Sequence, residues 1–152
     1  MSDAANGVRD GGCRCGRVRF SIQGPDMLTM ACHCIGCQRM TGSAFSLSLM
    51  VTEAAFRVTA GEPVVGGLHG EVGHFHCPHC MSWVFTRPPS AFGVVNVRAT
   101  MLDDATGFSP FMESYVSEKL PWVSTPASRS YPEFPTQQDW PELIAAFAKR
   151  AG

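Results

Sequence analysis

The feature that most constrains this chain is the grouping of its seven cysteines into three clusters. In chain order they are Cys13 and Cys15, then Cys32, Cys34 and Cys37, then Cys77 and Cys80. Spacings of one or two residues let neighbouring thiolates reach one ion without closing a long loop. Tetrahedral zinc takes four ligands, and thiolate is its preferred soft ligand. The spacing therefore predicts metal binding.

Seven cysteines divide naturally as four plus three. Two pairs can close one four-cysteine site, and the triplet then leaves its metal one ligand short. A closed site is typical of structural zinc, and a three-ligand site is typical of catalytic zinc. An odd number of cysteines at these spacings fits a disulfide framework poorly, so we expect metal ligands instead.

Length and composition favour a single folded domain. The chain has 152 residues, of which 45% are hydrophobic and 16% are charged. The charged share lies below the roughly 25% of soluble domains, and a chain of this kind does not resemble a disordered one. Its formal net charge of −1 gives no basic field, so we expect no nucleic-acid partner.

The first twelve residues contain no apolar core of a secretory signal, and no run approaches the roughly 18 apolar residues of a membrane span. We therefore expect a cytoplasmic chain with no membrane partner, in a compartment where thiols stay reduced.

Alternation of apolar and polar residues predicts a mostly β fold. Val18, Phe20 and Ile22 indicate a strand with one buried face, and the alternation from Phe45 to Val51 indicates another. We expect further strands at 27–32, 56–58, 72–77, 83–86, 93–99, 113–117 and 122–124. The 72–77 and 83–86 strands would form a hairpin with the C-x-x-C pair at its tip, which is the layout of a zinc ribbon.

The remaining segments are expected to be turns, loops and one helix. Residues 7–12 are predicted to be irregular, 36–42 a tight turn or short helix, and the proline-rich 121–135 a surface loop. Asp139 and Glu142 have the spacing of a capping box, with Pro141 in the first turn. Apolar residues on one face then predict a short C-terminal helix packed on a sheet.

The motifs together resemble those of the glutathione-dependent formaldehyde-activating enzyme family, which includes centromere protein V. The first is Gly12-Cys13-Arg14-Cys15-Gly16 with Val18 and Phe20, followed by Cys32-His33-Cys34-x-x-Cys37-Gln38 and Thr41-Gly42-Ser43-Ala44-Phe45. Phe75-His76-Cys77-Pro78-x-Cys80 and Lys119-Leu120-Pro121-Trp122-Val123 complete the order. The resemblance runs over roughly 11–134 within a single domain of 1–152.

The resemblance implies an Mss4-like β fold with two zinc ions. It implies a structural zinc held by Cys13, Cys15, Cys77 and Cys80, and a second, catalytic zinc at Cys32, Cys34 and Cys37. The implied reaction adds the thiol of glutathione to formaldehyde and gives S-(hydroxymethyl)glutathione, the chemistry of a carbon–sulfur lyase. Glutathione and formaldehyde are the implied small-molecule partners.

The chain departs from the family pattern at two places. Met81 stands where the family has a glycine after the last cysteine, and a glycine there supplies a positive φ. We expect a modestly altered turn with its ligands retained. The loop 127–134 also differs, and we expect a changed substrate if that loop shapes the pocket.

Several other residues are candidates for the triplet site. Arg39 is the best-placed cation for a ligand carboxylate, ahead of Arg17, Arg87 and Lys119. Ser43 and Phe45 are candidates for lining the pocket, and Trp122 is either a lid or a buried anchor. Four histidines are interpreted as supporting or surface residues rather than ligands; they are His33, His74, His76 and His79. His69 follows a glycine pair in a predicted loop and has no evident role.

Two other functional classes remain open alongside a zinc-dependent lyase. One is a non-catalytic zinc module that binds a partner. The other is a redox sensor that uses the under-coordinated triplet.

Overall fold

The computed structural model describes residues 7–66 and 70–150. The chain divides into two compact units. The first unit contains 7–26 and 49–107, and the second contains 27–48 and 108–150. Each unit holds one of the cysteine groups. The expectation of a single domain over 1–152 stays a prediction.

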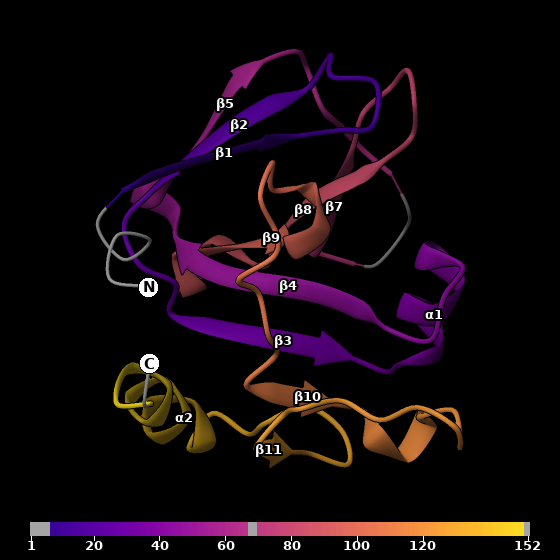
Figure 1. Cartoon of the computed structure of the whole chain (residues 1–152), viewed down its shortest axis with the longest axis vertical. Helices are drawn as coiled ribbons and strands as arrows, with labels where there is room; N and C mark the ends of the chain where they lie inside the picture. Colours follow the sequence, from indigo (N-terminus) through magenta and orange to yellow (C-terminus); the bar gives the residue numbers. More distant parts are fainter. Residues whose placement is uncertain (1–6, 67–69, 151–152) are drawn as a thin grey trace. The chain divides into compact units, whose positions relative to one another are not determined.

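The first unit is built from antiparallel strands (Figure 1). Three of them form a sheet in the order β1-β2-β5, with bounds Val8–Gly12, Arg19–Gln23 and Phe56–Ala60. Four more neighbour one another in the order β6-β7-β8-β9, with bounds Val64–Val65, Gly73–His76, Trp83–Arg87 and Val94–Arg98. Short 3-10 helices lie at Glu53–Ala55, Ser90–Phe92 and Ala99–Met101.

The second unit combines parallel strands with two helices. Strand β10 (Met112–Ser114) pairs in parallel with β3 (Leu28–Cys32) and with β11 (Arg129–Ser130). The helices are α1 (Ile35–Thr41) and α2 (Asp139–Ala148), with the 3-10 helix η5 at Val116–Glu118. Strand β4 (Ser46–Thr52) continues from this unit into the first, since the division falls after Ser48.

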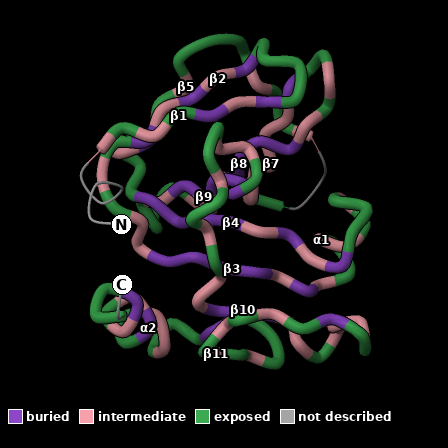
Figure 2. The backbone as a smooth tube through the Cα atoms, in the orientation of Figure 1, coloured by how far each residue is buried: buried purple, intermediate pink, exposed green. Residues whose placement is uncertain are grey.

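Aromatic packing fills the core of the first unit. The ring centroids of Phe56 and Phe85 are 4.7 Å apart, and Phe85 stacks on Phe75 at 4.7 Å. Phe20 joins the same group through Phe56 at 5.5 Å. Tilted and stacked rings at these separations add to the free energy gained from burial. In Figure 2, buried residues recur along β2, as the alternation of Val18, Phe20 and Ile22 predicts.

The mostly β fold with a short C-terminal helix is confirmed. Helix α2 buries Leu143 and Phe147, whose ring meets that of Phe111 edge-on at 5.5 Å. The predicted capping box is wrong in detail. The helix begins at Asp139 after Gln138, and the Asp139 carboxylate accepts hydrogen bonds from the N–H and hydroxyl of Thr136.

The expected irregular start at 7–12 is wrong, because Val8–Gly12 forms β1. Gly11 and Gly12 have low strand propensity, so propensity does not predict this strand. A Cβ at Gly11 would lie 2.3 Å from the carbonyl oxygen of Met101 and 2.4 Å from the ring of Phe20. Glycine is therefore required by a close approach of neighbouring backbone rather than by a turn.

Strand β4 is present as predicted, but its alternation is wrong. Ser46 and Ser48 are buried, while Phe45 and Leu47 are only half-buried. From Leu49 to Val51 every residue is buried, so the strand has no solvent face there. A strand buried on both sides does not show a clean period of two.

The strands expected at 113–117 and 122–124 are also corrected. Strand β10 ends at Ser114, because Tyr115 adopts a left-handed backbone (φ 55°) and η5 follows. Trp122 lies in a turn closed by the N–H of Val123 donating to the carbonyl of Leu120 at 3.1 Å. A short strand instead occurs at β11, within the predicted proline-rich loop.

Candidate metal centres

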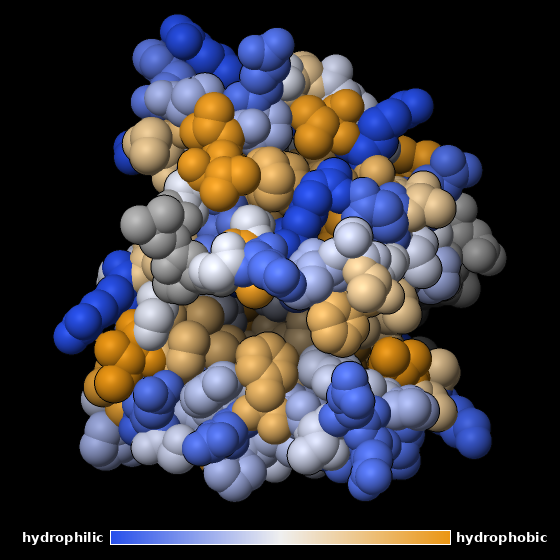
Figure 3. All heavy atoms as spheres, turned by 180° about the vertical axis from the view of Figure 1, so that it is seen from behind, coloured by the Kyte–Doolittle hydropathy of each residue, from blue (hydrophilic) through white to orange (hydrophobic). Residues whose placement is uncertain are grey.

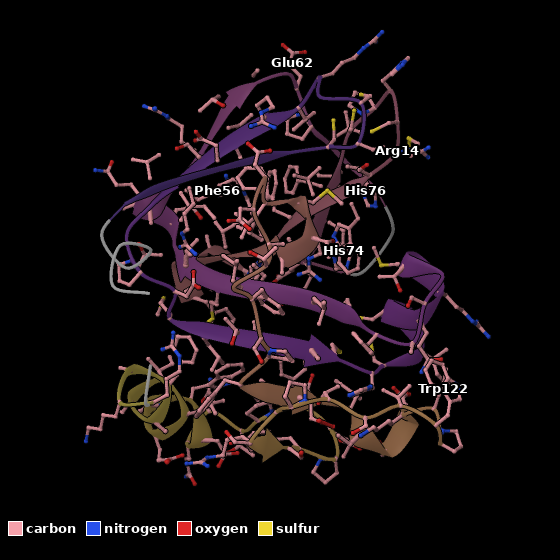
Figure 4. All side chains as sticks on the ribbon, viewed as in Figure 1. Arg14, Phe56, Glu62, His74, His76 and Trp122 are labelled. Atoms are coloured by element: carbon pink, nitrogen blue, oxygen red, sulfur yellow. The ribbon has the colours of Figure 1, made fainter. Side chains whose placement is uncertain are left out.

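The first cysteine cluster joins two turns of the first unit. Cys13 and Cys15 lie between β1 and β2, and Cys77 and Cys80 lie between β7 and β8. The four sulfur atoms all lie within 4.8 Å of one another. In Figure 4, sulfur atoms gather beside Arg14, the residue between Cys13 and Cys15.

The sulfur separations in this cluster suit a tetrahedral metal. Cys13 Sγ lies 3.6 Å from Cys15 Sγ, which lies 3.8 Å from Cys77 Sγ. Four sulfurs about 2.3 Å from a central zinc are about 3.8 Å apart in a regular tetrahedron. None of the seven cysteines, all of them in the described part of the chain, forms a disulfide. The donor set and spacing therefore fit a structural zinc site.

Backbone N–H groups point at the sulfurs, as the zinc-ribbon layout predicts. The N–H of Val18 donates to Cys13 Sγ at 3.3 Å, and the N–H of His79 donates to Cys77 Sγ at 3.4 Å. The hydroxyl of Ser82 lies 3.2 Å from Cys80 Sγ. These donors stabilise thiolate charge that a metal alone would otherwise have to balance.

The departure at Met81 is accommodated without a change of backbone conformation. Met81 keeps the left-handed backbone that a glycine would supply, with φ 62°. Its N–H donates to the carbonyl of Cys77 at 2.9 Å, and its side chain is 61% exposed. The turn therefore keeps a left-handed residue at position 81. Because Met81 has a Cβ, it carries steric strain in this backbone conformation.

The second cluster lies where β3 passes into α1, within the second unit. Cys32 ends β3, and Cys34 is the N-cap residue of α1, accepting the Cys37 N–H on its sulfur at 3.2 Å. The sulfurs of Cys32, Cys34 and Cys37 lie within 4.8 Å of one another. Among the described residues no further histidine, cysteine or carboxylate joins this group. A tetrahedral metal held here would take three ligands from the protein.

The electrostatics of the second cluster favour a bound cation. The pKa of Cys32 is lowered to about 3, chiefly because the Cys34 and Cys37 thiols donate to it. The pKa of Cys37 is raised, chiefly because its thiol donates a hydrogen bond to the Cys32 sulfur that ionisation would remove, and also because of its hydrogen bond with Cys34 and its burial. Without a metal the cluster therefore keeps thiol protons, whereas a divalent ion would stabilise all three thiolates.

Two buried serines support these sulfurs, and sequence reasoning missed both. Ser114 stands opposite Cys32 in the parallel β3–β10 register, and its hydroxyl lowers the pKa of Cys32. Ser46 opens β4, and its hydroxyl opposes the rise in the pKa of Cys37. A serine in a strand carries no signal that would have marked either one.

His33 faces away from the cluster formed by its two neighbours. Its ring is fully buried, with Nε2 3.4 Å from Oε1 of Glu113, and burial lowers its pKa. Lys119 Nζ lies 3.2 Å from the same oxygen, and the Thr125 hydroxyl donates to the other. Burial opposes ionisation of Glu113, but these donors outweigh it and leave its pKa lowered.

The other histidines in the described part of the chain do not join either cysteine group. His74 contacts the Thr86 hydroxyl at 2.9 Å through Nδ1, and His76 contacts the His74 carbonyl at 3.2 Å. Both rings pack against Trp83, and Figure 4 places both on β7. His79 contributes its backbone N–H to a sulfur, as described above. His69 lies outside the described residues.

The candidate cations are distributed over both units. Arg39 is exposed in the last turn of α1, where its role toward a ligand stays a prediction. Lys119 is instead tied to Glu113, and Arg87 pairs with Glu53 in the first unit. Arg17 is exposed in the first unit, close in sequence to Cys15.

The pocket candidates Ser43, Phe45 and Trp122 belong to the second unit. Ser43 is exposed, and Phe45 is half-buried with its ring 5.6 Å from that of His33. Trp122 is 76% exposed, so the alternative of a buried anchor is wrong. Figure 3 shows that exposed hydrophobic residues on the face it draws form separate groups among hydrophilic ones.

The loop 127–134 supports the backbone that follows β10. The carbonyl of Glu133 accepts from the N–H of Tyr115 at 3.1 Å, and that of Tyr131 accepts from Val116 at 3.1 Å. The carbonyl of Pro132 accepts from both the N–H and the hydroxyl of Ser117. The loop therefore fixes η5, and its effect on the substrate stays a prediction.

The chain is similar to a known protein family and to a solved structure. The model of one family, described as glutathione-dependent formaldehyde-activating enzyme, matches residues 8–118. A crystal structure of a Rhodobacter sphaeroides protein is similar in fold, with a TM-score of 0.52 and 19% identity over 66% of this chain and 91% of that one. No curated protein matches the chain. No described helix is long and apolar enough to span a membrane.

Proposed function

Because the chain belongs to the glutathione-dependent formaldehyde-activating enzyme family, we propose that it adds a thiol to formaldehyde or a related carbonyl. The activity is that of a zinc-dependent carbon–sulfur lyase of the S-(hydroxymethyl)glutathione synthase type. Glutathione is the proposed thiol, the cytoplasm the proposed location, and neither nucleic acid nor a membrane is a proposed partner.

The observation that carries this proposal is the contrast between the two cysteine groups. Four sulfurs in the first unit complete a tetrahedral set, whereas Cys32, Cys34 and Cys37 supply three. A three-thiolate site suits a fourth, thiolate ligand from a substrate better than it suits activation of water, because three anionic ligands weaken the Lewis acidity of their metal.

In this proposal the residues divide the work of binding. Cys32, Cys34 and Cys37 hold zinc, which when bound supplies the positive charge that lowers the pKa of an incoming thiol. Arg39 binds a carboxylate of the thiol substrate and orients it. Ser46 and Ser114 hold the Cys37 and Cys32 sulfurs by hydrogen bonds and fix their directions.

The reaction is an addition that needs no oxidant or reductant. The substrate sulfur forms a bond to the carbonyl carbon, and the C=O π electrons move to oxygen. The proton lost from the thiol ends on that oxygen, giving a hydroxymethyl thioether. The reverse step returns the thiol and the aldehyde, so one catalyst accelerates both directions.

Exchange NMR of glutathione, formaldehyde and their adduct tests the proposal. Zinc-loaded protein should raise the exchange rate above that of buffer, and Cys37→Ser should abolish the increase. Ser90→Ala, which changes an exposed serine of the first unit outside both cysteine groups, provides a control for general effects of substitution and should leave the exchange rate at its wild-type value. Zinc-loaded protein that gives no acceleration contradicts formaldehyde activation and shifts weight to a binding module.

A further inference from the structure

Trp122 is the most exposed of the large hydrophobic residues described, with 76% of its surface accessible. An indole left in water loses the free energy that burial would provide, so its exposure calls for a reason. Figure 4 draws it within the second unit on the side that carries α1. The segment that bears it, 119–125, contains no strand or helix.

This segment, here called the tryptophan loop (119–125), is fastened at both ends to one buried carboxylate. Lys119 Nζ lies 3.2 Å from Glu113 Oε1, and the Thr125 hydroxyl donates to Glu113 Oε2. Glu113 is only 4% exposed, so the carboxylate end of each contact is shielded from solvent. A charge-assisted attachment to this carboxylate at each end restrains the loop between them.

The same carboxylate contacts a residue of the segment that carries the three cysteines. Glu113 Oε1 lies 3.4 Å from Nε2 of His33, which stands between Cys32 and Cys34. A second connection runs through α1. The Ile35 N–H donates to the Glu118 carboxylate at 3.2 Å.

A third connection runs through one amide. The side-chain N–H₂ of Gln38 donates to the carbonyls of His33 at 2.8 Å and Glu118 at 3.0 Å. Two hydrogen bonds, from the Ile35 N–H and the Gln38 amide to Glu118, therefore join the segment that carries the cluster to the residue before the tryptophan loop. An exposed side chain on a restrained loop loses little further freedom when a ligand binds.

We propose that Trp122 contacts the non-thiol part of the thiol ligand bound at the three-cysteine cluster, and that Glu113 is the positioning residue that holds Trp122 there. The proposal rests on the proposed function, because it concerns a ligand of that cluster. The thiol it selects has an extended body with peptide or methylene groups, whose flat or apolar surface an indole can cover.

This role separates two contributions to thiol binding. The metal binds any small thiolate, because that interaction depends on the sulfur. Trp122 adds a contact only for a thiol long enough to reach it, so it discriminates among thiols by size. Because the contact is mainly apolar, it should respond little to ionic strength, unlike a contact made by Arg39.

Calorimetric titration of zinc-loaded protein with glutathione and with cysteamine tests this role. Trp122→Ala should weaken glutathione about tenfold, given the apolar area an indole covers, and should change cysteamine less than about twofold. Trp122→Phe should lie between the two proteins. Phe92→Ala removes a 59%-exposed aromatic residue in the first unit and should change neither ligand.

Glu113→Gln tests the positioning role, with zinc content and melting temperature measured alongside. The amide keeps the size and an acceptor but loses the charge that holds Lys119 and Thr125. Glutathione should weaken about threefold while cysteamine is unchanged. A purely structural role would lower the melting temperature and leave the ratio of the two affinities at its wild-type value.

The outcomes separate this inference from the function on which it rests. Wild-type zinc protein that binds neither thiol overturns both. Wild-type protein that binds glutathione, with Trp122→Ala binding it equally well, overturns only the role of Trp122. Equal weakening of glutathione and cysteamine also overturns it, because Trp122 would then support the metal cluster itself.

Discussion

Met81 donates its backbone N–H to the carbonyl of Cys77 at 2.9 Å while holding a left-handed φ of 62°. The turn that carries two ligands of the four-cysteine cluster therefore keeps its hydrogen bond despite a side chain that disfavours this conformation.

Met81→Gly should stabilise the metal-loaded protein. Glycine removes the Cβ that disfavours a left-handed backbone, a gain of about 1 kcal/mol that glycine's greater freedom when unfolded partly offsets. Denaturant unfolding measures the change. Met81→Ala is the matched control, since it removes the same exposed side chain but keeps the Cβ. Equal stabilisation by both would mean that exposure of methionine, and not strain, was responsible.

Replacement of cysteines should separate a structural from a functional cluster. Cys77→Ser removes one of four ligands that join two turns of the first unit, so it should unfold much of that unit and lower zinc content. Cys34→Ser should mostly spare the fold and release only the second ion, which we expect to be held less tightly. Circular dichroism and metal analysis measure both effects. A collapsed Cys34→Ser beside a folded Cys77→Ser would reverse the two assignments.

Zinc binding at the three-cysteine cluster should release about two protons near neutral pH. In the metal-free protein the lowered pKa of Cys32 leaves it ionised, while the raised pKa values of Cys34 and Cys37 keep both protonated. Affinity for zinc should therefore rise with pH, by about a hundredfold per pH unit.

Calorimetry in buffers of different ionisation enthalpy counts these protons. Because replacement of Cys77 and Cys80 should unfold much of the first unit, the four-cysteine site is kept and filled with zinc beforehand. Zinc is then titrated into the three-cysteine site alone. Release of three protons by the wild type would show that Cys32 is also protonated before the metal binds.

Arg39→Ala should weaken glutathione about tenfold or more while barely affecting cysteamine, which has no carboxylate. Arg39 is exposed on α1, so the loss should shrink as salt is raised. Titration of both thiols at low and high ionic strength measures it. Equal loss for the two ligands would mean that Arg39 supports the metal loop, and no loss would leave it a surface charge.

Local patterns predicted most of the elements but not how all of them pack. The alternation at Val18, Phe20 and Ile22 indicates β2 correctly, because only one face of that strand is buried. The same reasoning misplaces Ser46 and Ser48 in β4, where residues on both faces are buried. The strand β1 was missed because the need for Gly11 arises from its contact with Met101, far away in sequence.

The candidate site likewise has features that local sequence patterns predict and features that depend on tertiary packing. Spacing alone separates three cysteines from four, but the joining of Cys13 and Cys15 with Cys77 and Cys80 was an expectation from the family resemblance. Nothing local marks Glu113, since its importance depends on Lys119, Thr125 and His33 meeting at one carboxylate. Such a network forms only through tertiary packing.

One sulfur in the second unit has two tasks, since Cys34 caps α1 through the Cys37 N–H and also belongs to the three-cysteine cluster. Two constraints therefore fix the number of residues between Cys34 and Cys37. The N-cap hydrogen bond of α1 is one, and the placement of both sulfurs in the same cluster is the other. An insertion or deletion inside 35–36 would disrupt both at once, whereas the turns at 104–107 would tolerate a change of length. Length variation among natural versions of this chain should accordingly avoid the start of α1.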